Sequence, residues 1–437
     1  MASRLLHSSI KSLNKSMLAR WGKHLSSLPS DQFDVVIAGG GIMGLTTAYF
    51  LAKRIDPTKI CVIERDNKYE KASTPLSCGS IRQQFSVPEN IMMSKFGYDF
   101  ISKCNQYLKV EDDDDLDIQF RNAPYVYLVD ENREKLLREN YDVQRSMGAA
   151  VKLLSKKELS QIFPWINTDG IAIASLGLEN EGSFDPYSFL QCMRKKVVAM
   201  SVRYLNGEVV DIMRNQKEIA GIEVKMNEDN HKESIKCRYL VNACGPWAGH
   251  IASMAGIGSE KDGLMSVSLP VQPAKRYVYV YDCPTGPKST PAVTVDSSGT
   301  YFRRECSGYY ICGRSPSAEQ EPKCDNLDCD FEYFYDELWE FLAQRVPAFE
   351  SLKIVGGWGG FYDYNTVDQN AIIGAHPVLQ NFYFINGFSG HGIQQSPAAG
   401  RAISELIIDG KFTSIDLTRL GFDRILKNSP LNETNVI

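Results

Sequence analysis

The sequence lacks the groupings of cysteine and histidine that hold metal ions. None of its 11 cysteines belongs to a CxxC pair, and its 6 histidines form no cluster along the chain. We therefore expect no zinc or iron–sulfur site and no bound metal. An odd, dispersed set of cysteines is typical of free thiols in a reducing compartment.

The sequence also lacks a long apolar run and a strongly basic region. No run approaches the about 18 apolar residues that span a bilayer, which argues against an integral membrane protein and leaves at most peripheral membrane contact. The net charge is −5 and no basic cluster with interleaved aromatics occurs in the body of the chain, so no nucleic acid is expected as a partner. With 437 residues, 43% hydrophobic and 23% charged, the chain suits a soluble globular protein of two or three domains.

Acidic residues are missing from the first 30 positions, where serine is frequent and every charged side chain is basic. Residues 1–30 are therefore predicted to be a mitochondrial presequence, which would place the protein in the matrix or at the matrix face of the inner membrane. The alternative is a disordered basic tail. The cations are Arg4, Lys11, Lys15, Arg20 and Lys23, and the residues spaced to line one face of an amphipathic helix are Leu5, Leu6, Leu13, Met17 and Leu18.

Residues 34–64 predict a strand, a glycine-rich turn, a helix and a second strand that ends on an acid. Gly39, Gly41 and Gly44 stand at GxGxxG spacing, which permits a tight turn, close approach to a pyrophosphate and close packing of the helix. The helix start directs unpaired N–H groups at the phosphates, and Glu64 can accept hydrogen bonds from a ribose diol. A merely structural glycine turn is the alternative, but the complete unit favours dinucleotide binding.

A second glycine-rich loop precedes a long amphipathic helix near the end of the chain, and it contains Gly387, Gly390 and Gly392. Its backbone N–H groups and the positive end of the helix dipole would face the cleft. A reduced flavin collects negative charge near N1 and the C2 carbonyl, whereas a nicotinamide ring has no such demand. The loop therefore favours FAD as the cofactor and disfavours an NAD-dependent dehydrogenase.

The order of the expected elements indicates an α/β fold: a two-dinucleotide-binding (Rossmann-like) FAD domain with an inserted antiparallel-sheet substrate domain. Alternating strands between 270 and 314 indicate the antiparallel sheet. Helices are expected at about 88–107 and 330–345, and separate strands at 201–204 and 208–212. The predicted units are the presequence (1–30), a discontinuous FAD-binding domain (32–110, 180–255 and 355–420), a substrate or cap domain (111–179 and 256–354) and a C-terminal tail (421–437).

Three motifs, GGGIMG, VNACGPWA and GFSGHG, together resemble those of the D-amino-acid oxidase, sarcosine oxidase and dimethylglycine dehydrogenase superfamily of FAD enzymes. The stretches YFRRECSGYYICGRSP, GFYDYNTVDQN and GFSGHGIQQSP more specifically resemble the mitochondrial FAD-dependent oxidoreductase domain-containing proteins that assist assembly of respiratory complex I. This resemblance covers nearly everything after residue 32. It implies FAD contacts from Gly39, Gly41, Gly44, Glu64, Arg65, Val209 and Gly245 on the adenosine half, from Ser80 over the flavin ring, and from Gly390, His391, Gly392 and Ile393 at the pyrimidine end.

The candidates for catalysis around the expected flavin ring are Arg82, His391 and Arg303. Arg82 would lie over the ring; the alternative is a pair with a surface acid. His391 is the only histidine within a cofactor motif and could shuttle a proton, or it could be hydrogen-bonded to backbone within its loop. Arg303 and Arg304 alternate on a strand, so only one of them can face the cleft.

Several positions depart from the catalytic relatives. Leu76 and Phe361 stand where those relatives carry the histidine or cysteine that bonds the flavin, so the resemblance implies FAD held without a covalent link. Ile311 stands at the position of the lysine that activates oxygen, which favours a dehydrogenase over an oxidase. Phe85 and Gln394 replace the cations that hold the substrate carboxylate, so sarcosine is a poor candidate.

Two functions follow from the resemblance and the cofactor motifs. The first is a mitochondrial FAD-dependent oxidoreductase-fold protein required for assembly of respiratory chain complex I, with complex I subunits or assembly intermediates as partners. The alternative is an active FAD-dependent dehydrogenase that oxidises the C–N bond of a small amine or amino acid and passes the electrons to an acceptor other than oxygen. The two functions are compatible with each other.

Overall fold

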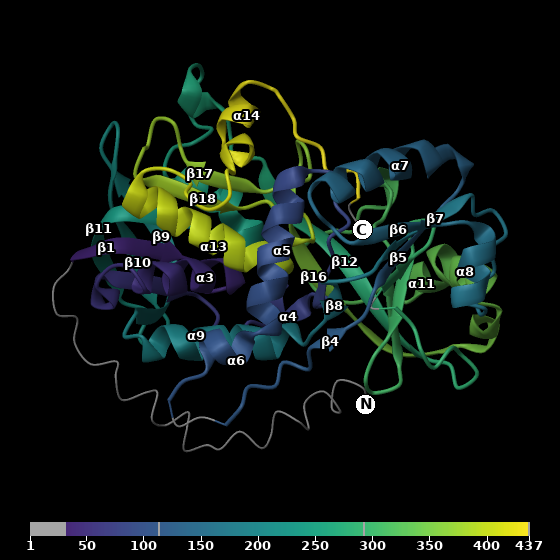
Figure 1. The fold of residues 1–437 in the computed structure, drawn as a ribbon. Coiled ribbons are helices and arrows are strands. Elements are labelled where there is room, and N and C mark those ends of the chain that lie inside the picture. Colours follow the sequence, from purple (N-terminus) through teal and green to yellow (C-terminus); the bar gives the residue numbers. More distant parts are fainter. Residues whose placement is uncertain (1–31, 112–113, 292, 436–437) are drawn as a thin grey trace.

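The computed structural model describes residues 32–111, 114–291 and 293–435, so the predicted presequence lies outside it (Figure 1). Two large sheets occupy the two halves of the molecule, one with seven strands and the other with eight. A third sheet is small and has three strands. It consists of β3 (Ser80–Ile81), β8 (Gly182–Ser183) and β4 (Arg121–Asn122).

The seven-stranded sheet has the order β1-β2-β9-β10-β11-β18-β17, and β1 also pairs with β11. Its centre is parallel, because β1 pairs in parallel with β2 and β11, and β2 pairs in parallel with β9. This arrangement confirms the predicted Rossmann-like fold. The strands are β1 (Gln32–Ala38), β2 (Ile60–Glu64), β9 (Arg203–Arg214), β10 (Ile219–Met226), β11 (Lys232–Asn242), β17 (Ile372–Ala375) and β18 (Phe382–Asn386).

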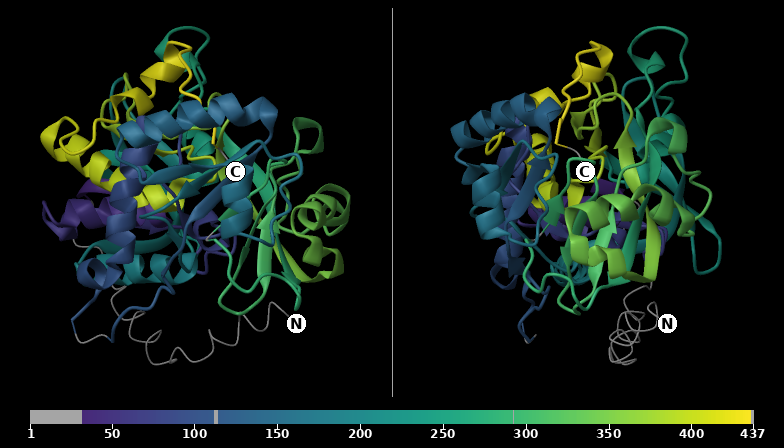
Figure 2. Two further views of the ribbon diagram at one scale, coloured as in Figure 1. Left: turned by 45° about the vertical axis from the view of Figure 1, so that its right-hand side comes forward. Right: turned by 90° about the vertical axis from the view of Figure 1, so that its right-hand side faces the viewer.

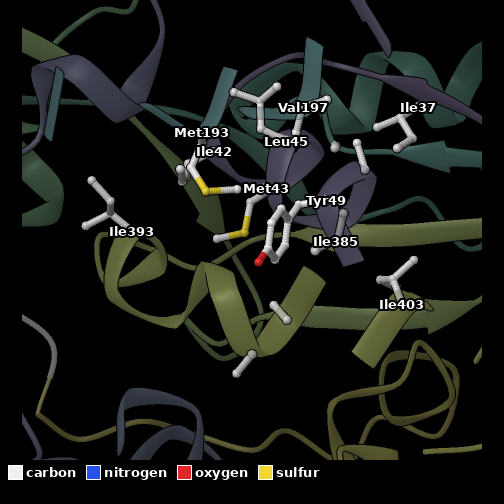
Figure 3. Packing of buried hydrophobic residues seen from close by; sticks show 14 of the residues in the cluster. Ile37, Ile42, Met43, Leu45, Tyr49, Met193, Val197, Ile385, Ile393 and Ile403 are labelled. Atoms are coloured by element: carbon white, nitrogen blue, oxygen red, sulfur yellow. The ribbon is translucent and has the colours of Figure 1, made fainter. Parts of the chain in front are cut away.

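Both faces of this sheet are covered. Val35 and Ile37 of β1 pack into an apolar cluster with four helices on one face, where Met43 and Tyr49 also lie (Figure 3). The alternate residues of β1 pack into a second cluster with α10 on the other face. Burial on both faces explains why β1 is a nearly continuous apolar run. The four helices are α3 (Ile42–Ala52), α5 (Pro88–Ser102), α9 (Pro186–Ala199) and α13 (Gly392–Asp409), and α10 spans Ala248–Met254.

The eight-stranded sheet has the order β16-β12-β15-β14-β13-β5-β7-β6, and all its pairs except β13 with β5 are antiparallel. The predicted inserted sheet is therefore present. Tyr277, Tyr279 and Tyr281 of β12 pack on its outer face, whereas Arg276 and Val278 point to the opposite side. The strands are β5 (Tyr125–Val129), β6 (Val151–Leu154), β7 (Ile173–Gly177), β12 (Val271–Asp282), β13 (Val293–Val295), β14 (Tyr301–Arg304), β15 (Tyr310–Gly313) and β16 (Lys353–Asn365).

Two predicted boundaries fall inside long strands of the structure, one within β9 and one within β16. The strands expected at 201–204 and 208–212 are the single strand β9, whose first part pairs with β2 and whose second part pairs with β10. The third FAD-binding segment was expected to begin at 355, within β16. Because β16 pairs with β12 along nearly its whole length, this segment belongs to the eight-stranded sheet as far as Asn365.

Two expected helices are interrupted. The helix expected at 88–107 breaks at Lys103, where ψ is 29°, and the helix expected at 330–345 breaks at Leu338, where φ is −119°. No helix in the described ranges is both long and apolar enough to cross a membrane. The remaining helices are α4 (Ser73–Leu76), α6 (Cys104–Leu108), α7 (Glu131–Ser146), α8 (Lys156–Ile162), α11 (Glu332–Glu337), α12 (Trp339–Arg345) and α14 (Asp423–Leu426).

Candidate functional site

A cavity of about 680 Å³ is lined by residues from distant parts of the chain. Its wall combines the turn after β1, the middle of β9, the segment before α10 and the loop before α13 with residues of β12, β14 and β16. The sequence-predicted residues on this wall are Gly39, Gly41, Glu64, Arg65, Ser80, Arg82, Val209, Gly245, Gly390, His391, Gly392 and Ile393. Two predicted site residues, Gly44 and Arg303, are not on it.

The glycines of the first turn fall into two groups. Gly39 has φ +101°, and a Cβ there would lie 2.3 Å from the carbonyl oxygen of Ala243; a Cβ on Gly44 would lie 1.9 Å from that of Gly39. These two positions serve the turn and the helix packing, as predicted. A Cβ on Gly41 would meet nothing nearer than 3.6 Å, and one on Gly245 nothing within 4 Å. The open space beside these two glycines faces the cavity, where a cofactor would fill it.

Glu64 closes the far end of the turn. Its carboxylate accepts hydrogen bonds from the backbone N–H groups of Gly40 and Asp66, both at 2.8 Å. Burial raises the pKa of this carboxyl, and the two backbone hydrogen bonds act in the opposite direction. Nearby, the Arg65 guanidinium stacks on the ring of Trp247 at 4.0 Å. The carboxylate retains lone pairs for a ribose diol.

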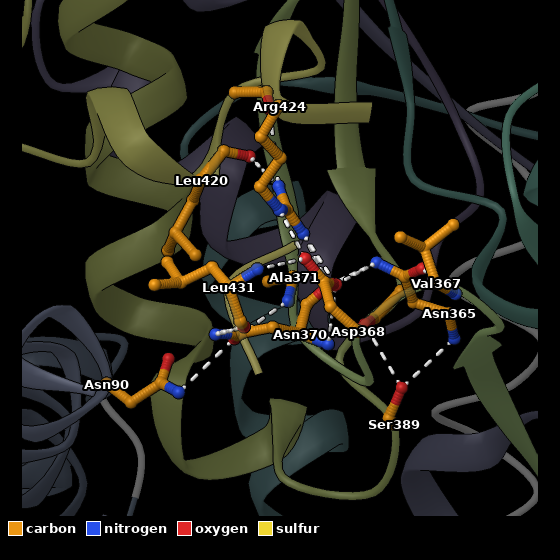
Figure 4. Close-up of polar contacts among 12 residues, drawn as sticks. Asn90, Asn365, Val367, Asp368, Asn370, Ala371, Ser389, Leu420, Arg424 and Leu431 are labelled. Atoms are coloured by element: carbon orange, nitrogen blue, oxygen red, sulfur yellow. Dashed lines mark hydrogen bonds and ion pairs between the residues drawn. The ribbon is translucent and has the colours of Figure 1, made fainter. Parts of the chain in front are cut away.

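The loop at 387–392 is fixed by a buried polar network (Figure 4). Asp368 and Arg424 form an ion pair at 2.7 Å, with their side chains 0% and 6% exposed. Asn365 donates its side-chain amide to Asp368 and its backbone N–H to the hydroxyl of Ser389. Arg424, in the predicted C-terminal tail, was not foreseen from the sequence. The segment that begins at α14 is therefore packed against the protein, and its Arg424 supports the loop.

His391 is 3% exposed and directly precedes α13. Both ring nitrogens are buried, and neither has a hydrogen-bond partner within the described part of the chain. The predicted alternative, in which the His391 side chain is hydrogen-bonded to the backbone of its own loop, is therefore wrong. Burial, with a smaller contribution from Arg82, lowers the pKa of His391 to about 3. The imidazole is neutral at physiological pH and is a poor base, but it is able to hydrogen-bond a ligand.

Arg82 is buried and lies on the cavity wall. Its guanidinium stacks on the ring of Phe85 at 3.9 Å and donates to the carbonyl oxygens of Gln84 and Asn435. Its backbone N–H donates to the side chain of Gln394 at 2.9 Å. No acid among the described residues pairs with it, so the alternative of a surface ion pair is wrong. Arg82 brings a positive charge to the cavity wall without a direct ion pair, and the buried carboxyl of Glu181 is near enough to feel that charge.

Arg303 does not reach the cavity, which corrects the expectation that it is catalytic. It is 5% exposed, and its Nε donates to Glu305 at 2.7 Å. Another nitrogen of the guanidinium donates to the carbonyl oxygen of Gly79. These bonds hold the side chain behind the turn that carries Ser80. Arg303 therefore positions that turn.

Arg276 lies on the cavity wall and was not singled out from the sequence. It pairs with Glu321 at 2.6 Å and lies over the ring of Tyr362 at 5.6 Å. The signal was present in the alternating strand RYVYVY, where Arg276 and Val278 share one face. Because the neighbouring tyrosines pack on the other face, Arg276 is the cation that this strand directs inward.

Leu76 and Phe361 both line the cavity, and neither carries a nucleophile. Three thiols also reach the wall: Cys78, Cys244 and Cys324. Burial raises the pKa of each of them, that of Cys244 to about 12, so they stay protonated and unreactive. No group of three or more metal-binding side chains occurs in the residues that the structure describes.

The sequence model of one family, FAD dependent oxidoreductase, matches residues 34–406. The chain belongs to this FAD dependent oxidoreductase family. Family membership makes FAD the cofactor of the site, and the cavity fits it: the open space at Gly41 and Gly245 suits the dinucleotide backbone, and the unpartnered His391 suits a polar ring. The match spans both sheets, since it begins in β1 and ends in α13.

Two relatives of this FAD oxidoreductase are named FAD-dependent oxidoreductase domain-containing protein 1 and FAD-dependent oxidoreductase domain-containing protein 1 homolog. The Xenopus laevis protein is 45% identical over 94% of this chain and 86% of its own length, and the Drosophila melanogaster homolog is 36% identical over 92% and 80%. The solved L-proline dehydrogenase from P. horikoshii has a TM-score of 0.75 and 26% identity, covering 92% of this chain and 100% of that one. Glycine oxidase from Geobacillus kaustophilus, at 19% identity and TM-score 0.72, shares the fold over 90% of this chain and 98% of its own.

Proposed function

We propose that this chain binds FAD without a covalent link and uses it to oxidise the C–N bond of a small amine or amino acid. The observation that carries the proposal is the retained cavity wall, where a buried unpaired Arg82 stands beside a neutral His391 with two unpartnered nitrogens. FAD, when bound, supplies the two-electron acceptor. The amine would lose a hydride from its α-carbon to this acceptor and a proton from its nitrogen to solvent water, which leaves an imine. Similarity to the L-proline dehydrogenase supports a substrate of this class.

The side chains of the wall have distinct tasks in this proposal. The positive charge of Arg82 stabilises negative charge that develops in the cavity. His391, with its lowered pKa, donates or accepts a hydrogen bond without changing its charge. Burial raises the pKa of Tyr362 to about 12, so this phenol stays neutral and forms a partly apolar wall. Arg276 pairs with Glu321 through one nitrogen but keeps its Nε without a partner among the described residues, and this N–H would bind an anionic group of the substrate in place of the two cations missing at Phe85 and Gln394.

Anaerobic reduction of the bound flavin is the direct test. The FAD-loaded protein is mixed with L-proline and a panel of other secondary amines and amino acids, with sarcosine as the contrast. We expect at least one compound to bleach the oxidised-flavin absorption, and slow reoxidation when air is admitted, because Ile311 stands where relatives have an oxygen-activating lysine. An absence of bleaching by the whole panel, with full bleaching by dithionite, would argue against an active dehydrogenase.

The non-covalent link is tested by acid precipitation. Because Leu76 and Phe361 carry no nucleophile and the cavity thiols are protonated, we expect all yellow flavin in the supernatant. Flavin retained in the pellet would contradict this expectation. Peptide mapping of that pellet would then be directed first at Cys78, which lies closest along the chain to the flavin-bonding position of the dimethylglycine dehydrogenases.

We further propose that the protein acts in the mitochondrial matrix and is required for assembly of respiratory complex I, with complex I subunits or intermediates as partners. Two features of the sequence support this: the acid-free basic segment 1–30 and the family-specific stretches YFRRECSGYYICGRSP and GFYDYNTVDQN. The relatives at 36–45% identity carry similar names but add no statement about complex I. The two proposals are compatible, since one concerns the cavity and the other a partner.

Complementation separates a structural role from a redox role. Cells that lack the native protein receive the wild-type chain, a chain without residues 1–30, or the double variant Arg82→Gln with His391→Leu. If assembly needs only a folded, FAD-filled protein, the double variant restores complex I. Loss of complex I despite normal FAD content would show that redox chemistry is needed. The chain without residues 1–30 should remain outside the mitochondrion and fail to restore complex I.

A further inference from the structure

A row of exposed aromatic side chains runs along the outer side of α11 and α12. Phe331, Tyr335 and Trp339 are 41%, 55% and 39% exposed and follow one another at intervals of four residues. In a continuous helix that spacing would place them on one side over about 12 Å; here the row runs from the residue before α11, through α11, to the first residue of α12, past the break at Leu338. Phe334 and Leu338 on the inner side are fully buried against the eight-stranded sheet. Two rings of the row touch this core, Phe331 at Tyr279 (6.1 Å between ring centroids) and Tyr335 at Phe334 (5.2 Å), and both keep a large part of their surface in solvent. Exposed aromatic side chains that lie this close along one surface segment indicate an interaction site.

An acid follows each aromatic residue of the row. Glu332, Asp336 and Glu340 are exposed, and none of them forms an ion pair with another described residue. Residues 324–344 contain seven acids and no lysine or arginine: Asp325, Asp328, Asp330, Glu332, Asp336, Glu337 and Glu340. We call the six outward residues Phe331, Glu332, Tyr335, Asp336, Trp339 and Glu340 the α11–α12 face.

We propose that the α11–α12 face binds a basic amphipathic helix presented by another protein. Apolar side chains of that helix would pack between the three aromatic rings, and lysine or arginine residues on its flanks would meet the carboxylates and the ring faces. Charge decides the occupant: a second copy of this chain would bring the same acids to the interface, and an anionic membrane surface would be repelled. A cationic helix complements both the rings and the acids.

This face is separate from the flavin cavity. The two surfaces lie on opposite sides of β12, since Tyr277 and Tyr279 pack beneath α11 and α12 whereas Arg276 and Val278 line the cavity. In the second view of Figure 2, α11 and α12 lie at the front of the molecule. The exposed fractions of the three rings show that the row is open to solvent. The inference therefore stands independently of the proposed redox chemistry, and docking leaves the flavin reaction unchanged.

The test measures binding of a fluorescein-labelled helical peptide of leucine and lysine, about five turns long, to the FAD-loaded full chain by fluorescence anisotropy. A scrambled peptide of the same composition and a leucine–glutamate helix serve as comparisons. One variant removes the rings (Tyr335→Ser with Trp339→Ser), and a second reverses the charges (Glu332→Lys, Asp336→Lys and Glu340→Lys). Matched controls carry Val198→Ser on α9, or Glu131→Lys, Glu139→Lys and Asp142→Lys on α7.

We expect the leucine–lysine helix to bind at least about tenfold more tightly than either comparison peptide, and both face variants to lose at least about tenfold in affinity. The controls should bind as the wild type does, and binding should weaken as salt rises. Flavin content and melting temperature should be equal in all variants. Equal binding by wild type and face variants would overturn the proposal. So would self-association of the free protein, or its retention on anionic vesicles, that the ring variant abolishes.

Discussion

Glu181 is a carboxylate buried at the junction of the two halves, 3% exposed. It accepts hydrogen bonds from the backbone N–H groups of Gln83 and Tyr125 and from the side chain of Gln84. Burial outweighs these donors and raises the pKa of Glu181 from 4.5 to about 7. The folded state thus binds a proton more tightly than the unfolded state, which couples stability to pH at this one residue.

The stability that Glu181 contributes should be complete below about pH 4.5 and should be lost as pH rises to about 7. The full change is on the order of 3 kcal/mol. In Glu181→Gln this slope should disappear, and the variant should be about 1–3 kcal/mol less stable at low pH, because its amide N–H faces a backbone donor. Urea unfolding at several pH values measures both effects. The exposed neighbour Glu179→Gln is the control, and an unchanged slope in Glu181→Gln would assign the pH dependence to another group.

His391 gives the second prediction at this scale. A buried imidazole with two unpartnered nitrogens costs the apoprotein about 1–3 kcal/mol, so His391→Leu should raise the melting temperature of the apoprotein. The same change should weaken FAD binding by about tenfold, because the ring can no longer hydrogen-bond the cofactor. Fluorescence titration with FAD and thermal unfolding test both statements. His376→Leu is the control: His376 accepts backbone hydrogen bonds away from the cavity, so its loss should lower stability and leave FAD affinity unchanged. A fall in apoprotein stability with His391→Leu would contradict the prediction.

For single residues, the sequence could predict a position in the structure where a motif allows each residue only one place. Gly39, Gly41 and Glu64 could be placed on the cavity wall, because a GxGxxG turn and the acid that ends the next strand fix where each position lies; their contacts with FAD stay predictions. Arg82 and Arg303 are the same residue type in similar surroundings, and only tertiary contacts decide between them. Arg303 is held by Glu305, two residues later, and by the carbonyl oxygen of Gly79, which is far away in the sequence and which no local pattern predicts as a partner.

Elements were predictable where local signals agree with the pairing of strands. The apolar strand β1 and the helix after it were foreseen, because their patterns are complete within one segment. β9 was foreseen as two strands, since nothing local shows that its two parts pair with different partners. β16 is a glycine-rich stretch in the sequence, GGWGGFYDY, for which no strand was predicted, and it becomes a strand because β12 lies beside it.

The loop at 387–392 depends on an ion pair between elements far apart in sequence, and this gives the third prediction. Arg424→Met leaves Asp368 buried without its partner and should lower the free energy of unfolding by about 3–5 kcal/mol. FAD affinity should fall as well, because the network that fixes Ser389 loosens. The exposed pair of Arg54 with Asp409 is the matched control, where Arg54→Met should cost less than about 1 kcal/mol. Similar losses in the two variants, measured by urea unfolding, would contradict a special role for the buried pair.

For the whole molecule, the cofactor site joins parts of the chain that no local pattern connects. The turn after β1, the segment before α10 and the loop before α13 supply the wall together, and the eight-stranded sheet closes it with Arg276 and Tyr362. A ligand that binds only the folded state stabilises it by mass action, about 2.7 kcal/mol at one hundred times its dissociation constant. FAD should therefore act as a structural link between the two sheets as well as a reactant.

Gly41 and Gly44, three positions apart, distinguish binding of FAD from packing of the turn, and they give the last prediction. In Gly41→Ala the added Cβ enters open space with φ −69°, so the apoprotein should melt at the wild-type temperature, but the rise in melting temperature on adding FAD should be lost. In Gly44→Ala the Cβ would meet the carbonyl oxygen of Gly39 at 1.9 Å. The folded protein should therefore be less stable than the wild type both without FAD and with it. Thermal unfolding with and without FAD distinguishes the two outcomes. An FAD-induced rise in Gly41→Ala equal to that of the wild type would mean that the cofactor does not lie against this turn, because a methyl group there would then displace nothing.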